Sequence, residues 1–368
     1  MRVGVVGLGN AGYRLHLPAL AGIPGANVVG GCDPDSAMRD RARRQFGIPV
    51  FDDFGTLLSQ TSPEVVIVGT PPDSHAEYCR RSLAAGAHVI CEKPFLPSVD
   101  EADAVLAEAR SAGRCVALNQ EFREMPIFRA IRDALTRDSP DGPLFAQVWQ
   151  LMYLPPGSEA GWRGQMTRRT LYEAGPHLVD LLMSLFGEKP RAVQAWTSPG
   201  DRSDGSDAVV VATLEFSRGR LAQLTQNRLC RGETQYVELR ADTRDGSFRG
   251  SFGGRARLSA GLLRSSRPHV RIEYGLSGVS WRERGVARQV LARNPRNPEM
   301  MATRVVLDRT IEAFRVGTEP PTSGESGRDI LEVVAACYRS AETGRRVELD
   351  RLDAPTRSLR MGTTSGKA

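Results

Sequence analysis

One lysine occupies an unusual position in the stretch HVICEKPFLP, residues 88–97. Of the 49 lysines and arginines in the chain, only three are lysines: Lys93, Lys189 and Lys367. Lys93 lies between Glu92 and Pro94, directly after an apolar run that predicts a buried strand. A lysine loses its proton readily when it is desolvated or faces another cation, whereas an arginine stays charged. Lys93 is therefore a candidate for proton transfer, while Lys189 lies outside any predicted strand end and is interpreted as part of a surface turn.

A second pair of titratable residues, Glu173 and His177, lies in TLYEAGPHLVDLLMSLFG, residues 170–187. Leucines on one face predict a helix, and Pro176 suits its first turn. Because residues four apart share a side of a helix, we expect the two side chains to lie close together. A helix N-terminus disfavours the imidazolium and a carboxylate favours it, a balance that suits a base for a hydroxyl proton. The alternative interpretation is a capping glutamate with a surface histidine.

The first predicted strand ends in a glycine-rich loop, GLGNAG, residues 7–12. Gly7 permits a tight turn, Gly9 lets the backbone approach a pyrophosphate, and Gly12 lets the following helix pack on the strand. The next strand ends at Asp33, whose carboxylate can accept hydrogen bonds from a ribose and would repel a 2′-phosphate. The pattern predicts an NAD site, with NADP less favoured; the alternative is a structural glycine turn with a capping aspartate.

The elements that must position these residues alternate between strand and helix in the first third of the chain. Apolar runs predict strands over 2–7, 27–32, 64–69, 87–91 and 114–119, and helical patterns fall at about 11–21, 35–46, 73–85, 98–111 and 126–136. This alternation predicts a doubly wound parallel sheet of the Rossmann type. Candidate residues at its strand ends include Thr70, Pro71 and, in the next helix, His75.

The second half of the chain has a different organisation. Successive short apolar runs from 145 to 240 predict a mostly antiparallel open sheet, and two helices are expected at about 301–316 and 327–342. We therefore expect an α/β protein with an NAD-binding domain over 1–122 and a separate α+β domain over 123–355. The helix at 327–342 is expected to pack back toward the first domain, and the polar tail 356–368 to be disordered.

The composition favours a soluble globular protein, with 40% hydrophobic and 25% charged residues. The net charge of +6 is spread along the chain, which disfavours a nucleic-acid partner. No run approaches the ~20 apolar residues of a membrane span, and no signal-peptide pattern precedes the first strand, so a cytoplasmic location without membrane contact is expected. Six cysteines without a C-x-x-C pair predict reduced thiols and no metal site.

Together, GVVGLGNAG, the strand end at Asp33, VVIVGTPPDSHAEYCRRSLAAGAHVICEKPF and the Glu173…His177 pair resemble the glucose–fructose oxidoreductase / inositol dehydrogenase (Gfo/Idh/MocA) family. The resemblance extends to PTSGESGRDILEVVAACYRSAETGRRVEL and covers essentially residues 1–350. It implies NAD(P)-dependent interconversion of a hydroxyl and a ketone on a sugar, cyclitol or related polyol. It also implies that 123–355 is the substrate and oligomerisation domain, whose open sheet bounds the substrate cleft on one face and assembles a homodimer or homotetramer through the other.

The resemblance assigns roles residue by residue. Lys93 corresponds to the family lysine that contacts the substrate hydroxyl and the nicotinamide, and His177 to the catalytic histidine. Glu173 replaces the usual aspartate, and Asp180 matches an acid that binds a substrate hydroxyl. Where the family often reads H-N-R-R-F, this chain reads LNQEF at 118–122, so Asn119 is retained, Gln120 and Glu121 differ, and Arg123 is expected to take over the basic role.

The resulting hypothesis has His177 removing the hydroxyl proton, Lys93 polarising the same oxygen and Glu173 orienting His177. The expected substrate-binding residues are Asp180, Arg123, Tyr153 and Arg163. The expected cofactor-binding residues are Gly7, Gly9, Asn10, Ala11, Gly12, Asp33, Thr70, Pro71, His75, Glu92, Lys93 and Asn119. Two alternatives stay open: a glycosidase or lyase that retains NAD for transient oxidation, and a non-catalytic NAD-binding sensor.

Overall fold

The protein is described by a computed structural model. It describes the chain except residues 156–160, 203–204, 232–235, 254–256, 263–267, 274–277, 286, 353 and 362–368, and within 254–277 it describes the backbone elements alone.

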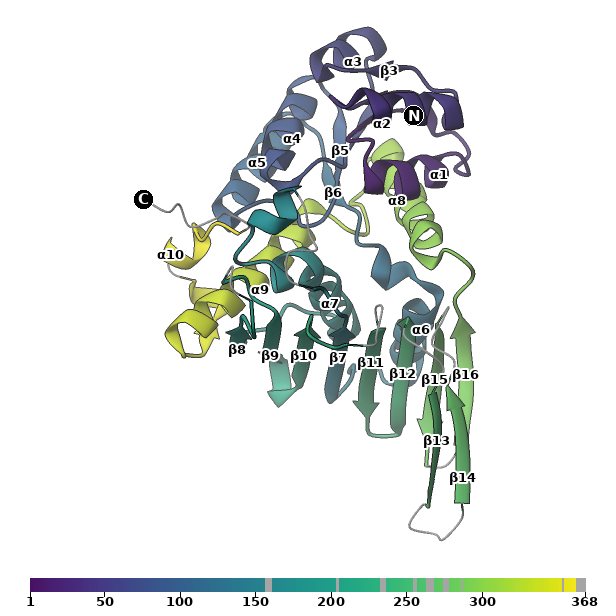
Figure 1. Cartoon of the computed structure of the whole chain (residues 1–368), viewed down its shortest axis with the longest axis vertical. Helices are drawn as coiled ribbons and strands as arrows, with labels where there is room; N and C mark the ends of the chain where they lie inside the picture. The colour runs from purple at the N-terminus through teal and green to yellow at the C-terminus, as the bar shows by residue number, and fades with distance from the viewer. Residues whose placement is uncertain are drawn as a thin grey trace.

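The N-terminal third forms a six-stranded parallel sheet with strand order β3-β2-β1-β4-β5-β6, the order of a Rossmann domain (Figure 1). Its strands are β1 (Arg2–Val6), β2 (Asn27–Cys32), β3 (Val50–Phe51), β4 (Val65–Val68), β5 (His88–Cys91) and β6 (Val116–Leu118). The five predicted strands are confirmed. The two-residue strand β3 was not expected, because two residues are too few to show a period.

Helices cover both faces of this sheet. They are α2 (Ser36–Phe46), α3 (Phe54–Thr61), α4 (His75–Ala84) and α5 (Val99–Ser111), preceded by a π-helical turn η1 (Gly12–His16) that continues into α1 (Leu17–Leu20). Asp35, Asp53 and Ser98 accept hydrogen bonds from backbone N–H groups at the starts of α2, α3 and α5. The short helix η2 (Pro72–Ser74) precedes α4. Helix α3 is the one helix of this domain that the sequence reading did not predict.

The second half of the chain forms a nine-stranded sheet with order β16-β15-β12-β11-β7-β10-β9-β8-β17. Its strands are β7 (Phe145–Leu151), β8 (Ala192–Ser198), β9 (Val209–Glu215), β10 (Leu221–Asn227), β11 (Tyr236–Thr243), β12 (Gly246–Gly253), β15 (Val279–Arg284), β16 (Ala287–Arg293) and β17 (Val347–Glu348). All neighbours are antiparallel except the parallel pair β7–β10. Strands β13 (Arg257–Leu262) and β14 (Pro268–Glu273) form a separate pair. The predicted fold class is confirmed.

One face of the large sheet carries helices α6 (Pro126–Asp138), α7 (Thr170–Phe186) and α9 (Gly324–Thr343). Side chains alternate along the strands, so that Val210, Ala212 and Leu214 of β9 are buried toward the helices. Their neighbours Val211 and Thr213 point to the opposite face and are only half-buried. This alternation explains why the sheet shows one helix-covered face and one open face.

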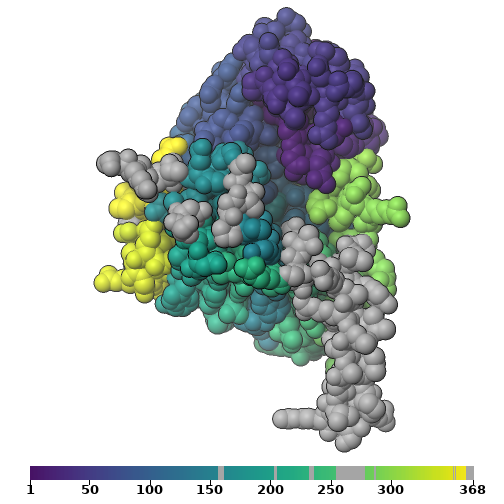
Figure 2. All heavy atoms as spheres, in the orientation of Figure 1, coloured from purple at the N-terminus to yellow at the C-terminus, as the bar shows by residue number. Residues whose placement is uncertain are grey.

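Helix α8 (Pro298–Val316) departs from the predicted division of the chain at residue 122. Leu307, Ile311 and Phe314 pack into a core with residues of β1 and α1. In Figure 2 the light-green α8 lies directly against the purple N-terminal segment. A helix from the second half of the chain thus completes the core of the first domain.

The segment leading into α9 also belongs to both halves. Thr322 accepts a hydrogen bond from the Leu118 N–H (2.8 Å) and donates its hydroxyl to the Leu118 carbonyl (2.6 Å) at the edge strand β6. Helix α9 then packs between α5 and β6 on one side and β8 and α7 on the other. Residues 327–342, which the sequence predicts to pack toward the first domain, lie within this helix.

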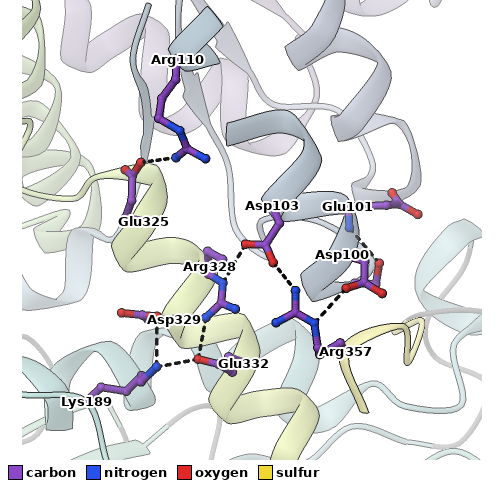
Figure 3. Close-up of polar contacts among 11 residues, drawn as sticks. Asp100, Glu101, Asp103, Arg110, Lys189, Glu325, Arg328, Asp329, Glu332 and Arg357 are labelled. Carbon is purple, nitrogen blue, oxygen red and sulfur yellow. Dashed lines mark hydrogen bonds and ion pairs between the residues drawn. The ribbon is translucent and has the colours of Figure 1, made fainter. Parts of the chain in front are cut away.

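An ion-pair network joins α9 to α5 and to the C-terminal segment (Figure 3). Arg328 donates to Asp103 of α5 (2.9 Å) and to Glu332 one turn further on (2.6 Å). Lys189 also donates to Glu332 (2.7 Å), so it is part of this network rather than an unpaired surface turn. Arg357 donates to Asp103 (2.6 Å). The network therefore connects α5 of the first domain, the segment after α7, α9 and the C-terminal segment.

The C-terminal tail corrects the prediction of disorder from residue 356 onward. Residues Ala354–Arg357 form the short helix α10, and Thr356 is buried. The Met361 side chain is buried as well, and its N–H donates to the Pro97 carbonyl (2.8 Å). The polar composition of the tail predicted disorder, but its arginines form ion pairs with carboxylates of α5, and these pairs hold the tail against the helix. Residues 362–368 lie outside the described part of the chain.

Arg328→Ala should lower the free energy of unfolding by about 1–3 kcal/mol, because it removes charged hydrogen bonds to the buried Glu332 carboxylate and to Asp103, which keep only Lys189 and Arg357 as partners. Arg110→Ala is the matched control: Arg110 joins the same two helices through Glu325 (3.3 Å), but its side chain is 64% exposed, so a loss of about 0–0.5 kcal/mol is expected. Thermal and urea denaturation of both variants measure the difference. Equal losses would contradict a stabilising role for the buried network.

Candidate functional site

A cavity of about 750 Å³ lies between the carboxyl ends of the Rossmann strands and the helix-covered face of the second domain. Ligands of open α/β sheets bind at this edge. From the first domain it is lined by the glycine-rich loop, Asp33, Thr70–Pro72, Glu92 and Lys93. From the domain junction it is lined by Glu121 and Phe122, and from the second domain by Gln150, Met152, Leu154, Trp162, Arg163, Glu173, His177, Arg228 and Glu299.

The glycine-rich loop has the geometry of a dinucleotide cradle. Gly7 has φ +87°, and a Cβ there would lie 2.5 Å from the Gly69 carbonyl oxygen, so only glycine fits. A Cβ on Gly12 would lie 2.1 Å from the Gly7 oxygen, so its absence lets the helix start against the loop. Gly9 instead faces open space, with nothing within 4 Å of an added Cβ. This open backbone fits the pyrophosphate of NAD.

Asp33 joins the second strand to this loop. Its Oδ2 accepts a hydrogen bond from the Leu8 N–H (2.8 Å), and its Oδ1 accepts one from the Asp35 N–H (2.9 Å). The carboxylate is thus held at the rim of the cavity, where an adenosine ribose would lie. Arg39 donates to the backbone carbonyls of Asp33 and Pro34 rather than to the Asp33 carboxylate.

Glu92 is a buried carboxylate that organises the loop carrying Lys93. Its Oε1 accepts a hydrogen bond from the Asn119 side chain (2.8 Å) and lies 2.8 Å from His16 Nε2, while Oε2 accepts from the Lys93 N–H (3.1 Å). Burial opposes ionisation of Glu92, but the His16 contact, the Asn119 hydrogen bond and the Lys93 charge outweigh it and hold the pKa of Glu92 at about 2. Asn119 therefore positions Glu92 and does not line the cavity.

His75 is fully buried beneath the same loop. Its Nδ1 lies 3.0 Å from the Pro94 carbonyl oxygen and 2.9 Å from that of Phe95, and its Nε2 lies 2.8 Å from the Thr70 carbonyl oxygen. Burial lowers the pKa of His75 despite these contacts. His75 thus ties the end of β4 to the Lys93 loop from below and does not line the cavity, so it positions this loop and is not placed to touch the cofactor as expected.

The expected pairing of Glu173 with His177 is absent from the structure. The Glu173 carboxylate accepts hydrogen bonds from Arg163 Nε (2.6 Å) and Arg228 Nη2 (3.0 Å). Burial alone would raise the pKa of Glu173, but Arg228, Lys93 and Arg163 lower it to about 2. Two guanidinium groups compete successfully with a neutral imidazole for this carboxylate.

Lys93 reaches across the cavity to the second domain. Its ammonium donates to the backbone carbonyl of Glu173 (3.2 Å), and its side chain is half-buried. It therefore lies at the first turn of α7, the helix that also carries His177. The lysine and the histidine, 84 residues apart in the sequence, line one cavity as the sequence predicts.

His177 is buried in α7, with its ring stacked on Phe122 at 4.2 Å between centroids. Desolvation and the positive charge of Lys93 hold the pKa of His177 well below its usual range, so the imidazole is neutral at physiological pH. Its Nε2 lies 3.6 Å from Glu121 Oε1, while Nδ1 has no hydrogen-bond partner among the described residues. A neutral imidazole lining a cavity can accept a proton.

Three of the four expected substrate-binding residues do not line the cavity. Asp180 is buried in a two-point ion pair with Arg123, with Nε to Oδ2 at 2.7 Å, and this pair joins α7 to the helical turn η3 (Glu121–Glu124). Tyr153 follows Met152 in an extended segment, so it points to the opposite face, beneath Arg231. Arg163, from the turn η4 (Gly161–Gln165), lines the cavity as expected.

The sequence alone does not identify several of the residues that line the cavity. Glu121 and Arg228 are buried charged groups at the cavity, and Gln150 and Trp162 line its far side. The alternation of β7 gives a signal for Gln150, since every second residue of that strand faces the helices. Arg228 lies just beyond β10 and no local pattern distinguishes it from the other arginines of the chain.

The described residues show no group of three or more metal-ligating side chains and no helix long and apolar enough to cross a membrane. All six cysteine thiols are free.

The chain matches two family models in succession. Residues 1–120 match the model described as "Oxidoreductase family, NAD-binding Rossmann fold", and residues 128–249 match the "GFO/IDH/MocA C-terminal domain". The chain is thus an oxidoreductase with an NAD-binding Rossmann domain. It belongs to the Gfo/Idh/MocA family, and its cofactor is NAD.

Individual relatives agree with this placement. The chain is 26% identical to the D-apiose dehydrogenase of Paraburkholderia graminis over 96% of its own length and 91% of the relative's. It is 25% identical to the D-glucoside 3-dehydrogenase of Escherichia coli, covering 95% and 97% of the two chains. Several further relatives match over only about half of their own length.

A solved oxidoreductase from Agrobacterium radiobacter, in complex with NAD+, L-tartaric acid and magnesium, superimposes with a TM-score of 0.80. The overlap covers 95% of this chain and 98% of that one, at 17% identity. At this identity the likeness establishes the shared fold.

Gly9→Ala should weaken NAD binding at least about tenfold while leaving stability within about 0.5 kcal/mol, because its methyl group would enter open space that the pyrophosphate needs. Gly7→Ala is the contrasting variant: its Cβ meets backbone at positive φ, so a loss of more than about 1 kcal/mol of stability is expected. Calorimetric NAD titration and thermal denaturation measure both. Unchanged NAD affinity in a folded Gly9→Ala variant would contradict the assigned cradle.

Proposed function

We propose that this protein interconverts a secondary hydroxyl and a ketone on a sugar, cyclitol or related polyol, with NAD as the redox partner. The observation that carries the proposal is one cavity lined by the open glycine loop, the Lys93 ammonium and a neutral His177. The names of the full-length relatives, dehydrogenases of apiose and of glucosides, support a carbohydrate substrate.

The cofactor would be held by the first domain. The backbone from Gly9 to Gly12 suits its pyrophosphate, with Asn10 and Ala11 in the loop, and Thr70–Pro72 with Glu92 line the remainder of that side. When bound there, NAD supplies the acceptor for a hydride. Asp33 favours NAD over NADP, because its carboxylate would lie where a 2′-phosphate must fit.

His177 and Lys93 act on the substrate oxygen. In oxidation, neutral His177 takes the hydroxyl proton, and the Lys93 ammonium stabilises the negative charge that develops on the oxygen. In reduction, the same groups return the proton. Glu173 holds Arg163 and Arg228 in place by accepting a hydrogen bond from each, while the Lys93 ammonium is bonded to a backbone carbonyl and remains available for the substrate oxygen.

The far side of the cavity suits a polyhydroxylated molecule. Gln150, Arg163 and Arg228 offer hydrogen-bond donors, and the Trp162 ring offers an apolar surface. Such a mixture of polar groups and an aromatic ring is typical of small polar ligands held in one orientation.

Lys93→Arg should reduce kcat/KM by about 10²-fold or more while NAD affinity stays within about threefold, because a bulkier, planar guanidinium keeps the charge but does not fit the position from which the ammonium stabilises the substrate oxygen. Lys189→Arg, at a lysine distant from the cavity, is the matched control and should keep full activity. The measurement is reduced-nicotinamide absorbance with NAD or NADP and a panel of pentoses, hexoses, cyclitols and glycosides.

A signal with one substrate class would support the dehydrogenase and identify the cofactor preference. Turnover of a glycoside without added cofactor would instead favour transient oxidation by retained NAD. NAD binding without turnover of any panel member would contradict the proposed function and favour a binding role.

We further propose that two copies associate through the open face of the large sheet. Direct strand pairing aligns Trp196, Val211, Thr225 and Trp149 in one row across β8, β9, β10 and β7. Trp196 is 55% exposed, and the row lies on the face opposite the helices. An aromatic and aliphatic row of this kind is typical of a subunit interface.

Val211→Asp should convert the proposed oligomer to a monomer, because it places a charge in the middle of the row. Val290→Asp is the control, at an exposed valine of the distant strand β16, and should leave the mass unchanged. Light scattering after size-exclusion chromatography gives the masses. A monomeric wild-type protein at micromolar concentration would contradict the proposed assembly.

A further inference from the structure

The carboxyl group of Glu121 is a second acid in the cavity that the mechanism above does not use. Glu121 is buried, and its Oε1 lies 3.6 Å from His177 Nε2. Its Oε2 is also buried and has no hydrogen-bond partner among the described residues. An unpartnered carboxyl oxygen in the interior is unusual and costly, which points to a functional reason for its presence.

The surroundings of Glu121 single out His177 as its partner. Glu121 begins the turn η3, and the next residue, Phe122, stacks on the His177 ring at 7° between planes. One short turn therefore fixes the orientation of the imidazole and presents a carboxyl group to its Nε2. This arrangement is what the sequence reading expected of Glu173, which the structure pairs with two arginines instead.

The charged groups around Glu121 come from three other elements. The charged Glu92 and Lys93 follow β5, Glu299 lies in the first turn of α8, and the neutral but titratable His177 belongs to α7. Burial and the negative charges of Glu92 and Glu299 raise the pKa of Glu121 to about 8, although Lys93 acts in the opposite direction. At neutral pH the side chain is largely a neutral carboxylic acid beside a neutral imidazole.

We propose that Glu121 is the positioning residue that shares a proton with His177 during catalysis. The inference rests on the proposed dehydrogenase function. In oxidation the substrate O–H proton passes to His177, and the carbon gives up its hydrogen with two electrons to oxidised NAD, so that a ketone forms. When Glu121 is ionised, its carboxylate stabilises the resulting imidazolium, and the proton then leaves to water. In reduction the protonated pair holds the proton that the new hydroxyl requires.

The proposal predicts opposite pH dependences for the two directions. Ionised Glu121 makes His177 a stronger base, so kcat for oxidation should rise with pH around an apparent pKa near 8 that belongs to the pair. The kcat for ketone reduction should fall over the same range. Glu121→Gln should remove both dependences and lower oxidation at pH 9 about tenfold or more, with KM changed less than about threefold.

Two further variants separate this role from a structural one. Glu121→Asp keeps a titrating carboxyl and should restore the pH dependence in part. Glu124→Gln removes a buried carboxylate in the same turn that pairs with Arg132 and Arg309, away from the cavity, and should leave the pH profile unchanged. A Glu121→Gln enzyme with the wild-type pH profile would overturn the proposal, while a wild-type protein inactive on all polyols would overturn the proposed function instead.

Two measurements without turnover test the same pair. In protein labelled at histidine, with His177→Asn assigning the signal, the His177 ring resonance should shift between pH 7 and 9 in the wild type and stay constant in Glu121→Gln. Because the folded protein holds the Glu121 proton up to about pH 8, whereas an unfolded glutamate loses it near 4.5, the wild type loses stability as pH rises through this window. The melting temperature of Glu121→Gln should therefore rise relative to wild type from pH 5 to 8. An unshifted ring resonance in the wild type would overturn the proposal.

Discussion

The buried, ionised carboxylate of Glu92 is the contact on which the candidate site depends. A charge in the interior is tolerated only when it is compensated, and here a side-chain amide, an imidazole and a backbone N–H surround it. These partners come from the residue after β6, the π-helical turn η1 and the Lys93 loop itself. The same carboxylate therefore fixes the end of β5 against its neighbours and aims Lys93 at α7, while His75 holds the following residues from beneath.

The two domains depend on each other through elements that are distant in the sequence. Helix α8 completes the core of the N-terminal domain, and α9 lies between both sheets with its arginine paired to α5. The cavity is enclosed by residues of both domains, so its geometry requires these contacts to hold. Buried apolar packing of α8 and a partly buried ion-pair network around Arg328 fix the two domains relative to each other. Such fixed geometry suits chemistry that needs atoms placed within fractions of an ångström.

The sequence predicted the parts of the fold and site that local patterns encode. Strand–helix alternation predicted the Rossmann sheet, and the glycine spacing predicted a loop in which Gly7 and Gly12 have no room for a side chain. Side-chain pairing was predicted less well, because it depends on residues brought together from afar. Glu173 and His177 share a helix, yet Arg163 and Arg228 take the carboxylate. Asp180 and Tyr153 also differ from expectation. Asp180 forms a buried ion pair with Arg123, and the alternation of side chains along an extended segment points Tyr153 away from the cavity.

Glu173 and Glu121 show how the folded environment sets the pKa of a side chain of one residue type. Both are glutamates lining one cavity, and burial alone would raise the pKa of each. Two arginines and Lys93 reverse this effect at Glu173 and hold its pKa at about 2, whereas neighbouring carboxylates reinforce it at Glu121 and raise its pKa to about 8. The site thus shifts the pKa values of two glutamates in opposite directions. The ionised Glu173 pairs with fixed cations, whereas the neutral Glu121 can exchange a proton near neutral pH. The replacement of basic residues by Gln120 and Glu121 at the domain junction thus places a proton-holding group next to the histidine.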